Sequence, residues 1–305
     1  MMTPLVQRCL AGLLLAGLCG LARAQVPLVV TTTPILADFV REVAGDAVQV
    51  ESIVPPGVSP RDYEPGEAAV ARLARAQALV IQGLDYDAWS EGVAREAGFA
   101  GELIVATDRM PLLDLSGREY EMDEGTEIDG EGFDPNTWHD PRKVIHTARV
   151  LAVALADLRP AEAAAIEQRA AAFIRALEDV HQHALRRFAT LPPERRRMAT
   201  SLDGFAYLAA TYEVQIGLIP GFEPGRQPQP AQMARLIDLI EPLNVPAVFL
   251  AAGTSATALR ELQEATGVRV ITTLFTDTLG PPGSPDGSYL AQFRRNVDLI
   301  VDALK

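Results

Sequence analysis

One long stretch with helical periodicity divides this chain into two parts. Residues 160–191, PAEAAAIEQRAAAFIRALEDVHQHALRRFATL, are rich in Ala, Glu, Arg and Leu, and they contain no Gly and no Pro after the first residue. At a rise of 1.5 Å per residue, about thirty helical residues make a helix of roughly 45 Å, longer than one small lobe requires. The sequence therefore predicts a rigid helix, assigned to residues 158–191, that joins two lobes.

Short apolar, β-branched runs alternate with helical patterns on both sides of this helix. The strand candidates are PLVVTTT (27–33), VQVESIV (48–54), ALVIQG (78–83), GELIVATD (101–108), RMATS (197–201), VQIGLIP (214–220), PAVFLAA (246–252) and VRVITT (268–273). This alternation is typical of parallel sheets covered by helices. The predicted fold class is α/β, with one mostly parallel sheet in an N-terminal lobe (25–157) and another in a C-terminal lobe (192–305).

The first 24 residues have the pattern of a secretory signal peptide. Arg8 precedes an apolar run over 9–21, and Ala-Arg-Ala follows it, as in a small-x-small cleavage site. The apolar run is too short to span a bilayer comfortably. We expect cleavage after Ala24 and a mature chain in the periplasm. A lipid anchor at Cys19 is disfavoured, because Leu18 stands where such signals have a small residue.

Cysteine content and charge exclude several classes of function. Both cysteines, Cys9 and Cys19, lie in the signal segment, so the mature chain has no thiolate ligand, disulfide or Cys nucleophile. The formal net charge is −13, which argues against nucleic acid or anionic lipid as a partner. No second apolar segment is long enough for a membrane span, so we expect no membrane insertion after cleavage, and a monomer.

Four polar loops follow predicted strands or precede predicted helices. They are SPRDYEP (59–65), DPNTWHDP (134–141), SLDGF (201–205) and FTDTLGPPGSPDG (275–287). Open parallel sheets bind ligands beyond the carboxyl ends of their strands. Because the loops are shared between both predicted lobes, the expected site is the cleft between them.

These loops and several other segments carry a resemblance to a known family. They include TTTPILADFVREVAGD (31–46), YEP (63–65), ALVIQGLDYDAW (78–89), DPNTWHDP, LIPGFEPG (218–225), PAVFL (246–250), TGVRV (266–270) and FTDTL (275–279). In this order and spacing the mature chain resembles the periplasmic zinc- and manganese-binding proteins of ABC transporters, the ZnuA/TroA/PsaA family. The resemblance implies two lobes joined by one long helix, Zn or Mn as cargo between them, and an ABC permease of the inner membrane as partner.

The family's metal ligands map onto Arg61, Asn136, Leu202 and Asp277, and only Asp277 is a usual metal ligand. A guanidinium has no free lone pair, and an Asn side chain offers one neutral oxygen. A zinc site needs three or four N, O or S ligands. The sequence therefore predicts a divergent member of the family with an altered cleft.

Two hypotheses remain for this cleft. A rearranged metal site of Asp62, His139 and Asp277 requires two ligands to shift along their loops, although the neighbour of a loop-end ligand commonly points elsewhere. Alternatively, Arg61 neutralises Asp277. That arrangement either closes the site as an ion pair or opens it to an anionic or zwitterionic ligand.

The remaining candidates have both structural and functional interpretations. Trp138 either packs in the core or lines the cleft, and Asp203 either caps the following helix or faces the cleft. His146 is a surface or packed residue, and His181 and His183 are solvated residues on the long helix. The acidic loop 116–134 is either a solvated loop or a weak collector of hard cations.

The sequence favours the solute-binding component of a metal-type ABC transporter. The alternative is a periplasmic binding or accessory protein without a transport role, either metallochaperone-like or specific for a non-metal ligand. We expect no enzyme, because the mature chain has no Cys nucleophile, no GxSxG motif and no phosphate-binding loop. Asp140, beside His139, is better explained as the N-cap of the helix that follows.

Overall fold

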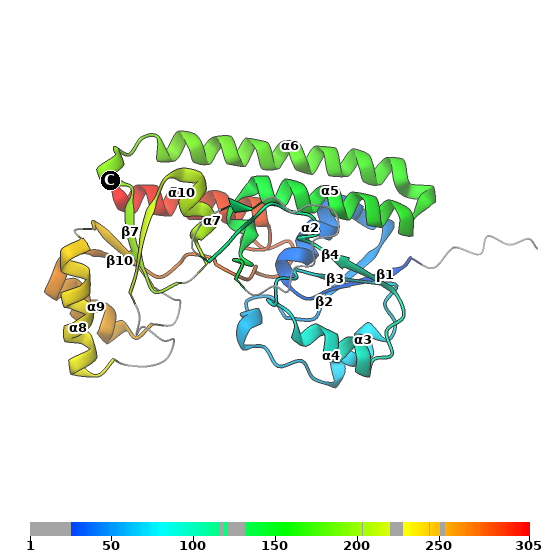
Figure 1. Cartoon of the computed structure of the whole chain (residues 1–305), viewed down its shortest axis with the longest axis horizontal. Helices are drawn as coiled ribbons and strands as arrows, with labels where there is room; N and C mark the ends of the chain where they lie inside the picture. Colours follow the sequence, from blue (N-terminus) through cyan, green and yellow to red (C-terminus); the bar gives the residue numbers. More distant parts are fainter. Residues whose placement is uncertain are drawn as a thin grey trace, which may run out of the picture.

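The computed structural model describes residues 26–115, 119–120, 132–202, 204–219, 228–243, 245–250 and 254–305, and for residues 62, 119, 120 and 243 only the backbone. Two parallel four-stranded sheets form its two lobes (Figure 1). The N-terminal sheet has the order β2-β1-β3-β4, and its strands are β1 (Leu28–Thr31), β2 (Gln49–Ser52), β3 (Ala78–Ile81) and β4 (Glu102–Val105). The strands of the other sheet, in the order β10-β9-β7-β8, are β7 (Arg197–Thr200), β8 (Gln215–Leu218), β9 (Ala247–Phe249) and β10 (Arg269–Ile271). The α/β class with two parallel sheets is confirmed.

Helices cover both sheets, and β5 (Leu112–Leu113) and β6 (Glu119–Tyr120) pair antiparallel in a separate two-stranded sheet. The α-helices are α2 (Pro34–Ala44), α3 (Glu67–Leu73), α4 (Trp89–Glu96), α5 (Pro141–Leu158), α6 (Ala163–Phe188), α7 (Ala206–Tyr212), α8 (Pro230–Ile240), α9 (Ala256–Thr266) and α10 (Tyr289–Leu304). Among these helices none is long and apolar enough to cross a membrane.

Helix starts follow from local sequence. Pro34 occupies the first turn of α2, and Thr33 accepts a hydrogen bond from the Leu36 N–H at 3.2 Å. Asp140 accepts from the Arg142 N–H at 2.9 Å at the start of α5, with Pro141 in the first turn. The predicted N-cap at Asp140 is therefore confirmed.

The long helix α6 is shorter than the predicted segment and is packed along its length. It has 26 residues, or about 39 Å, because the chain turns through a 3₁₀ segment, η4 (Pro160–Glu162), before it starts. Its buried residues recur every three or four positions, from Ile166 to Phe188, which is the spacing of one helix face. Figure 1 shows α6 running over both lobes with α5 and α10 beneath it.

One apolar core extends through both lobes. It includes Val29 and Phe39 of the first lobe, Leu177 of α6, and Phe249 and Phe205 of the second lobe. Two separate clusters lie under the outer helices, one beneath α3 and α4 and the other beneath α8 and α9. Because the lobes share a core, their relative position is fixed by packing as well as by the chain connection.

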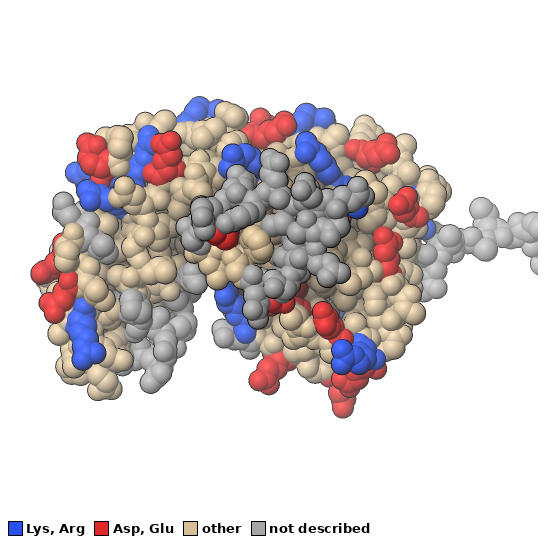
Figure 2. All heavy atoms as spheres, viewed as in Figure 1, with Lys and Arg blue, Asp and Glu red and all other residues tan. Residues whose placement is uncertain are grey.

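The space-filling view shows a notch between the lobes and a mixed distribution of charge. Lys and Arg side chains alternate with Asp and Glu over the face in Figure 2. The predicted signal segment 1–24, most of the acidic loop 116–134 and Asp203 lie outside the described residues. Their predicted roles stay predictions.

Candidate functional site

The first site loop crosses from the N-terminal lobe to the C-terminal lobe. After β2, the Gly57 N–H donates to the Leu279 carbonyl at 2.8 Å, and Ser59 Oγ donates to Asp277 Oδ2 at 2.6 Å. The chain then forms a 3₁₀ turn, η2 (Pro60–Asp62), with Ser59 as its N-cap. The loop of the predicted cleft residues therefore lies against the loop that carries Asp277.

Arg61 extends from η2 toward a second loop of its own lobe. Its Nη2 donates to Asn136 Oδ1 at 3.2 Å, and its Cζ lies 5.5 Å from the centre of the Tyr86 ring. This residue is exposed. Arg61 is thus supported by an aromatic face and an amide, while its charge still faces solvent.

Asn136 is held from three sides. Both its backbone N–H and its Nδ2 donate to Asp134 Oδ1, at 2.8 and 2.5 Å, which directs Oδ1 toward Arg61. Gly204 from the other lobe approaches so closely that a Cβ there would lie 3.0 Å from the Asn136 side chain. The φ of Gly204 is also +128°, so a larger residue at this position would strain the backbone.

Asp277 takes its hydrogen bonds from hydroxyl groups. Besides Ser59, the Thr276 Oγ1 donates to Oδ1 at 3.2 Å. No ion pair joins Asp277 to Arg61, although the structure describes both side chains. The closed form of the ion-pair hypothesis is therefore wrong, because Arg61 turns to Asn136; the open form remains.

Tyr86 lies beneath the Arg61 guanidinium and is influenced by the charges of both Arg61 and Asp277. Burial raises the pKa of its phenol well above the usual value, Asp277 raises it further, and Arg61 opposes the change. Its hydroxyl is buried without a hydrogen-bond partner in the described structure. Sequence reasoning did not single out Tyr86. The signal was available, since Tyr86 follows the strand candidate ALVIQG, and the carboxyl ends of parallel strands are where such sheets bind ligands.

The other predicted cleft residues contribute less. Leu202 is half-buried and packs against the shared core, so it offers no ligand atom. Asp62 lies in η2, but its side chain is not among those described. The N-cap of α7 is Phe205, whereas Asp203 precedes it outside the described residues.

Trp138 is a packing residue that also fastens the Asp277 loop. It lies in the 3₁₀ turn η3 (Thr137–His139), it is buried, and its ring lies edge-on to Tyr86 with centroids 5.2 Å apart. Its Nε1 donates to the Thr276 carbonyl at 2.5 Å, and its own carbonyl accepts from the Tyr289 hydroxyl at 2.7 Å.

His139 is buried behind this loop. Burial lowers its pKa to about 3, and a backbone hydrogen bond with Thr276 opposes that change in part. Its ring centroid is 4.5 Å from that of Phe205. Within the described ranges, no three His, Cys, Asp or Glu side chains lie together as a metal site. The rearranged set that includes Asp62 stays a prediction.

The remaining histidines have protein partners. His146 Nε2 is 2.7 Å from the Asp108 carbonyl. On α6, His181 Nδ1 is 2.9 Å from the Tyr212 hydroxyl, and His183 Nε2 is 3.0 Å from Asp298 Oδ1. Both α6 histidines are partly buried, so the expectation that they are simply solvated is wrong: the helix packs against α7 and α10.

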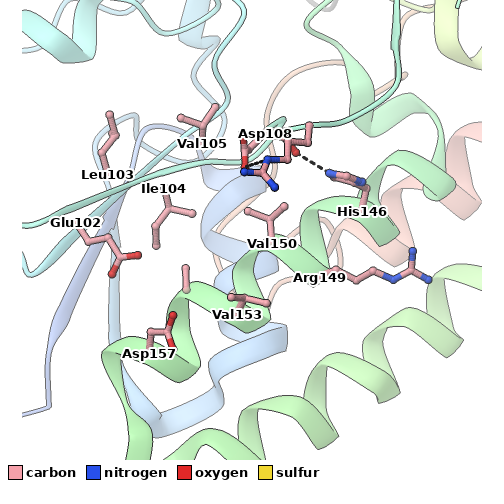
Figure 3. Close-up of a pocket in the computed structure, with 12 residues that line it drawn as sticks. Glu102, Leu103, Ile104, Val105, Asp108, His146, Arg149, Val150, Val153 and Asp157 are labelled. Carbon is pink, nitrogen blue, oxygen red and sulfur yellow. Dashed lines mark hydrogen bonds and ion pairs between the residues drawn. The ribbon is translucent and has the colours of Figure 1, made fainter. Parts of the chain in front are cut away.

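A hollow of about 600 Å³ lies outside the inter-lobe region. It runs between the edge strand β4 and α5, with Glu102 and Asp157 at one end and His146 and Arg149 at the other (Figure 3). No residue of the four site loops lines it. We place the candidate solute site between the lobes, because the interlocked loops lie there at the carboxyl ends of the strands.

Comparison with known proteins gives consistent matches over nearly the whole chain. The model of the family "Zinc-uptake complex component A periplasmic" matches residues 29–303. The zinc-binding protein TroA of Treponema pallidum is 27% identical over 284 residues, covering 91% of this chain and 89% of TroA. The manganese ABC transporter substrate-binding lipoprotein PsaA of Streptococcus pneumoniae is 25% identical over 282 residues, covering 90% of this chain and 88% of PsaA.

A solved structure shares the fold. The periplasmic zinc-binding protein TroA from Treponema pallidum superposes with a TM-score of 0.75 at 25% identity, covering 91% of this chain and 99% of that chain. The range matched by the family model, residues 29–303, includes all four site loops and the long helix.

Proposed function

This chain belongs to the family of periplasmic zinc-uptake component A proteins, and from that premise we propose that its inter-lobe site takes a solute that carries an anionic group. The family consists of solute-binding proteins of ABC transporters, not enzymes. In the proposal the anionic group binds Arg61, and a cationic or hydrogen-bond-donating group binds Asp277. The observation that carries it is a guanidinium at a position where the family resemblance places a metal ligand.

The surroundings of Arg61 support an anion contact. A guanidinium has five N–H donors, and within the described structure the Arg61 side chain uses Nη2 alone, toward Asn136. The remaining donors can bind a carboxylate or phosphate in the bidentate geometry that Arg favours. A bare divalent cation at this point would instead meet a fixed positive charge.

The surroundings of Asp277 favour a solute that carries both a positive and a negative group. The Asp277 carboxylate belongs to the other lobe, and among the described residues it accepts hydrogen bonds from neutral hydroxyls and forms no ion pair with a protein cation. A zwitterion would complement both groups. So would Zn²⁺ or Mn²⁺ carried in a carboxylate-bearing chelate, which also agrees with the metals named for TroA and PsaA.

Isothermal titration tests this proposal. The titrants are Zn²⁺ alone, Mn²⁺ alone, each metal with citrate, and a mixture of zwitterionic amino acids. We expect no tight site for either metal alone and binding of one of the anionic or zwitterionic titrants. Arg61→Ala should weaken that binding by about 10- to 100-fold.

The matched control is Arg75→Ala, which removes an exposed arginine elsewhere in the same lobe and should leave binding unchanged. A tight site for Zn²⁺ or Mn²⁺ alone that is abolished by Asp277→Ala would overturn the proposal.

The transport role and compartment are tested separately. Sequencing the N-terminus of the mature protein from a periplasmic fraction should give a chain that starts after Ala24. A permease and an ATPase encoded beside this gene, with loss of solute uptake when the chain is deleted, support the importer. Normal uptake after deletion favours the alternative, an accessory binding protein.

A further inference from the structure

A small cavity lies directly behind the loop that carries Asp277. Its volume is about 20 Å³, enough for one water molecule. The wall has four parts: Ile35 of α2, Trp138 and His139 from η3, the loop residues on either side of Asp277, and one face of α10. Asp277 itself does not line the cavity, and its carboxylate is turned to Ser59 on the inter-lobe side.

Two residues that line this cavity each have a buried side-chain atom without a hydrogen-bond partner in the described part of the chain. The atoms are His139 Nε2 and Gln292 Oε1, and both residues are at least nine-tenths buried. The orientation of the Gln292 amide is fixed, because its Nε2 donates to the Asp286 carbonyl at 2.9 Å. Its oxygen is therefore the free end, and it can only accept a hydrogen bond.

His139 also presents an acceptor. The ring is almost fully buried, and burial disfavours the charged imidazolium. The backbone of Thr276 favours the protonated ring, as a carbonyl that accepts from a ring N–H does. Since Nε2 has no partner, this contact is made by Nδ1–H, which leaves Nε2 with a lone pair. Two acceptors cannot satisfy one another, so the cavity requires a molecule with two donors.

We propose that the cavity binds one water molecule, which donates one hydrogen bond to His139 Nε2 and the other to Gln292 Oε1. A water in a site of this size needs two to four polar partners, and these two atoms supply the minimum. Without it, each buried acceptor would be unsatisfied, a costly state that folded proteins mostly avoid.

This water completes the support of the Asp277 loop. Asn296 of α10 clamps Phe275 through two hydrogen bonds, of 3.1 Å from the Phe275 N–H and 2.6 Å to its carbonyl. Trp138 holds Thr276. The water would link η3 to α10 beneath the same loop, so it is a positioning element for Asp277. This inference does not depend on which solute the cleft binds.

Crystallography of the wild-type protein tests the proposal directly. At high resolution we expect one ordered water within hydrogen-bond distance, roughly 2.7–3.2 Å, of both His139 Nε2 and Gln292 Oε1. It should be present in the solute-free and solute-bound forms alike. An empty cavity, or a water that contacts only one of the two atoms, would overturn the proposal.

A double-mutant cycle tests the energetic link. His139→Phe and Gln292→Met each remove one acceptor, and each should lower the folding equilibrium constant by about tenfold. If the two effects were independent, they would multiply in the double variant. We expect its folding equilibrium constant to be at least about fivefold higher than that product, because both substitutions lose the same water.

The control is Gln263→Met on the exposed side of α9, which should change the folding constant by less than about twofold. Hydrogen exchange at Thr278 gives a second readout. It should accelerate in both cavity variants and not in the control. Strictly additive effects, with unchanged exchange at Thr278, would show that no shared water connects the two side chains.

Discussion

The two faces of the inter-lobe site differ in where their polar groups find partners. On the N-terminal face, Arg61 bonds Asn136, and Asn136 is oriented by Asp134 of the same lobe. On the C-terminal face, Asp277 receives its shortest hydrogen bond from Ser59 of the opposite lobe. The hydrogen bonds of the N-terminal face thus stay within one lobe, with Gly204 of the other lobe packed against Asn136, whereas the C-terminal face is organised by a hydrogen bond between the lobes.

This difference bears on the proposal that the cleft takes a solute of mixed charge. In the proposed site, Arg61 and Asn136 stand at two positions where the family resemblance places ligands, and they bond each other, so the first lobe presents a positive group there. Asp277 kept its carboxylate, and neutral hydroxyls leave its charge available. A site with a fixed cation on one side and an available anion on the other suits a solute of mixed charge.

Restoring histidine on the N-terminal face should produce the largest effect. In Arg61→His with Asn136→His, two imidazoles would join Asp277 as three ligands, the minimum for a zinc site with an open position. We expect Zn²⁺ affinity to rise at least about 100-fold over wild type, or about 2.7 kcal/mol. Isothermal titration in a non-chelating buffer measures it.

The single variant Asn136→His is the matched control. It keeps the guanidinium and should gain little affinity, because the positive charge still opposes the metal. No zinc site in the double variant would mean that positions 61, 136 and 277 do not converge on one point.

A buried carboxyl where α2 meets the start of α10 should give the next largest effect. Asp38 of α2 accepts from the Tyr289 N–H at 2.8 Å at the start of α10. Burial raises its pKa to about 6, Glu42 adds to the shift, and the Tyr289 hydrogen bond opposes it. The folded state therefore binds the proton more tightly than the unfolded chain does, so stability should fall by about 2–3 kcal/mol as pH rises from about 4 to 6.

Asp38→Asn should remove this slope, because the amide can still accept from Tyr289 but does not ionise. At pH 8 we expect an unfolding free energy about 1–2 kcal/mol above wild type, measured by chemical denaturation across the pH range. Asp179→Asn, on the exposed side of α6, should leave the slope unchanged. An identical pH profile for Asp38→Asn and wild type would disprove the raised pKa.

The fold was predictable because each element carries its own signal. The β-branched runs, the Pro and N-cap residues at Thr33 and Asp140, and the periodicity of α6 are local properties of the sequence. The continuous core through both lobes was harder to predict from the sequence. It depends on which face of α6 meets α5 and α10, and two lobes joined by a rod fit the same periodicity.

The site was predictable in position but only partly in contacts. The polar loops and the resemblance located Arg61, Asn136 and Asp277. Neither could show that Arg61 turns to Asn136 and Tyr86 instead of Asp277, since that choice depends on the orientation of side chains from three separate loops. The partner of Asp277, Ser59, was overlooked because a serine beside a proline is common in turns.

The hydrogen bond from Ser59 to Asp277, which organises the C-terminal face, can be removed by deleting one oxygen atom. Ser59→Ala deletes the hydroxyl that reaches Asp277 across the lobes, and we expect a loss of about 1 kcal/mol in unfolding free energy. Thr276→Val deletes the longer hydrogen bond made within the same lobe, and should cost about half as much. Chemical denaturation compares the two, and equal losses would refute the distinction drawn between the faces.

The smallest effect is expected from the hydroxyl of Tyr86 on the N-terminal face. Tyr86→Phe keeps the ring beneath Arg61 and beside Trp138 and removes a buried hydroxyl without a partner in the described structure. Deleting an unsatisfied polar group is close to neutral, so we expect stability within about 0.5 kcal/mol of wild type. Tyr63→Phe, whose ring packs edge-on against Trp89, is the control.

A loss above about 1 kcal/mol would show that the Tyr86 hydroxyl has a bound water as partner. Unchanged stability with weaker solute binding would instead show that the N-terminal face recognises its solute through Tyr86 as well as Arg61.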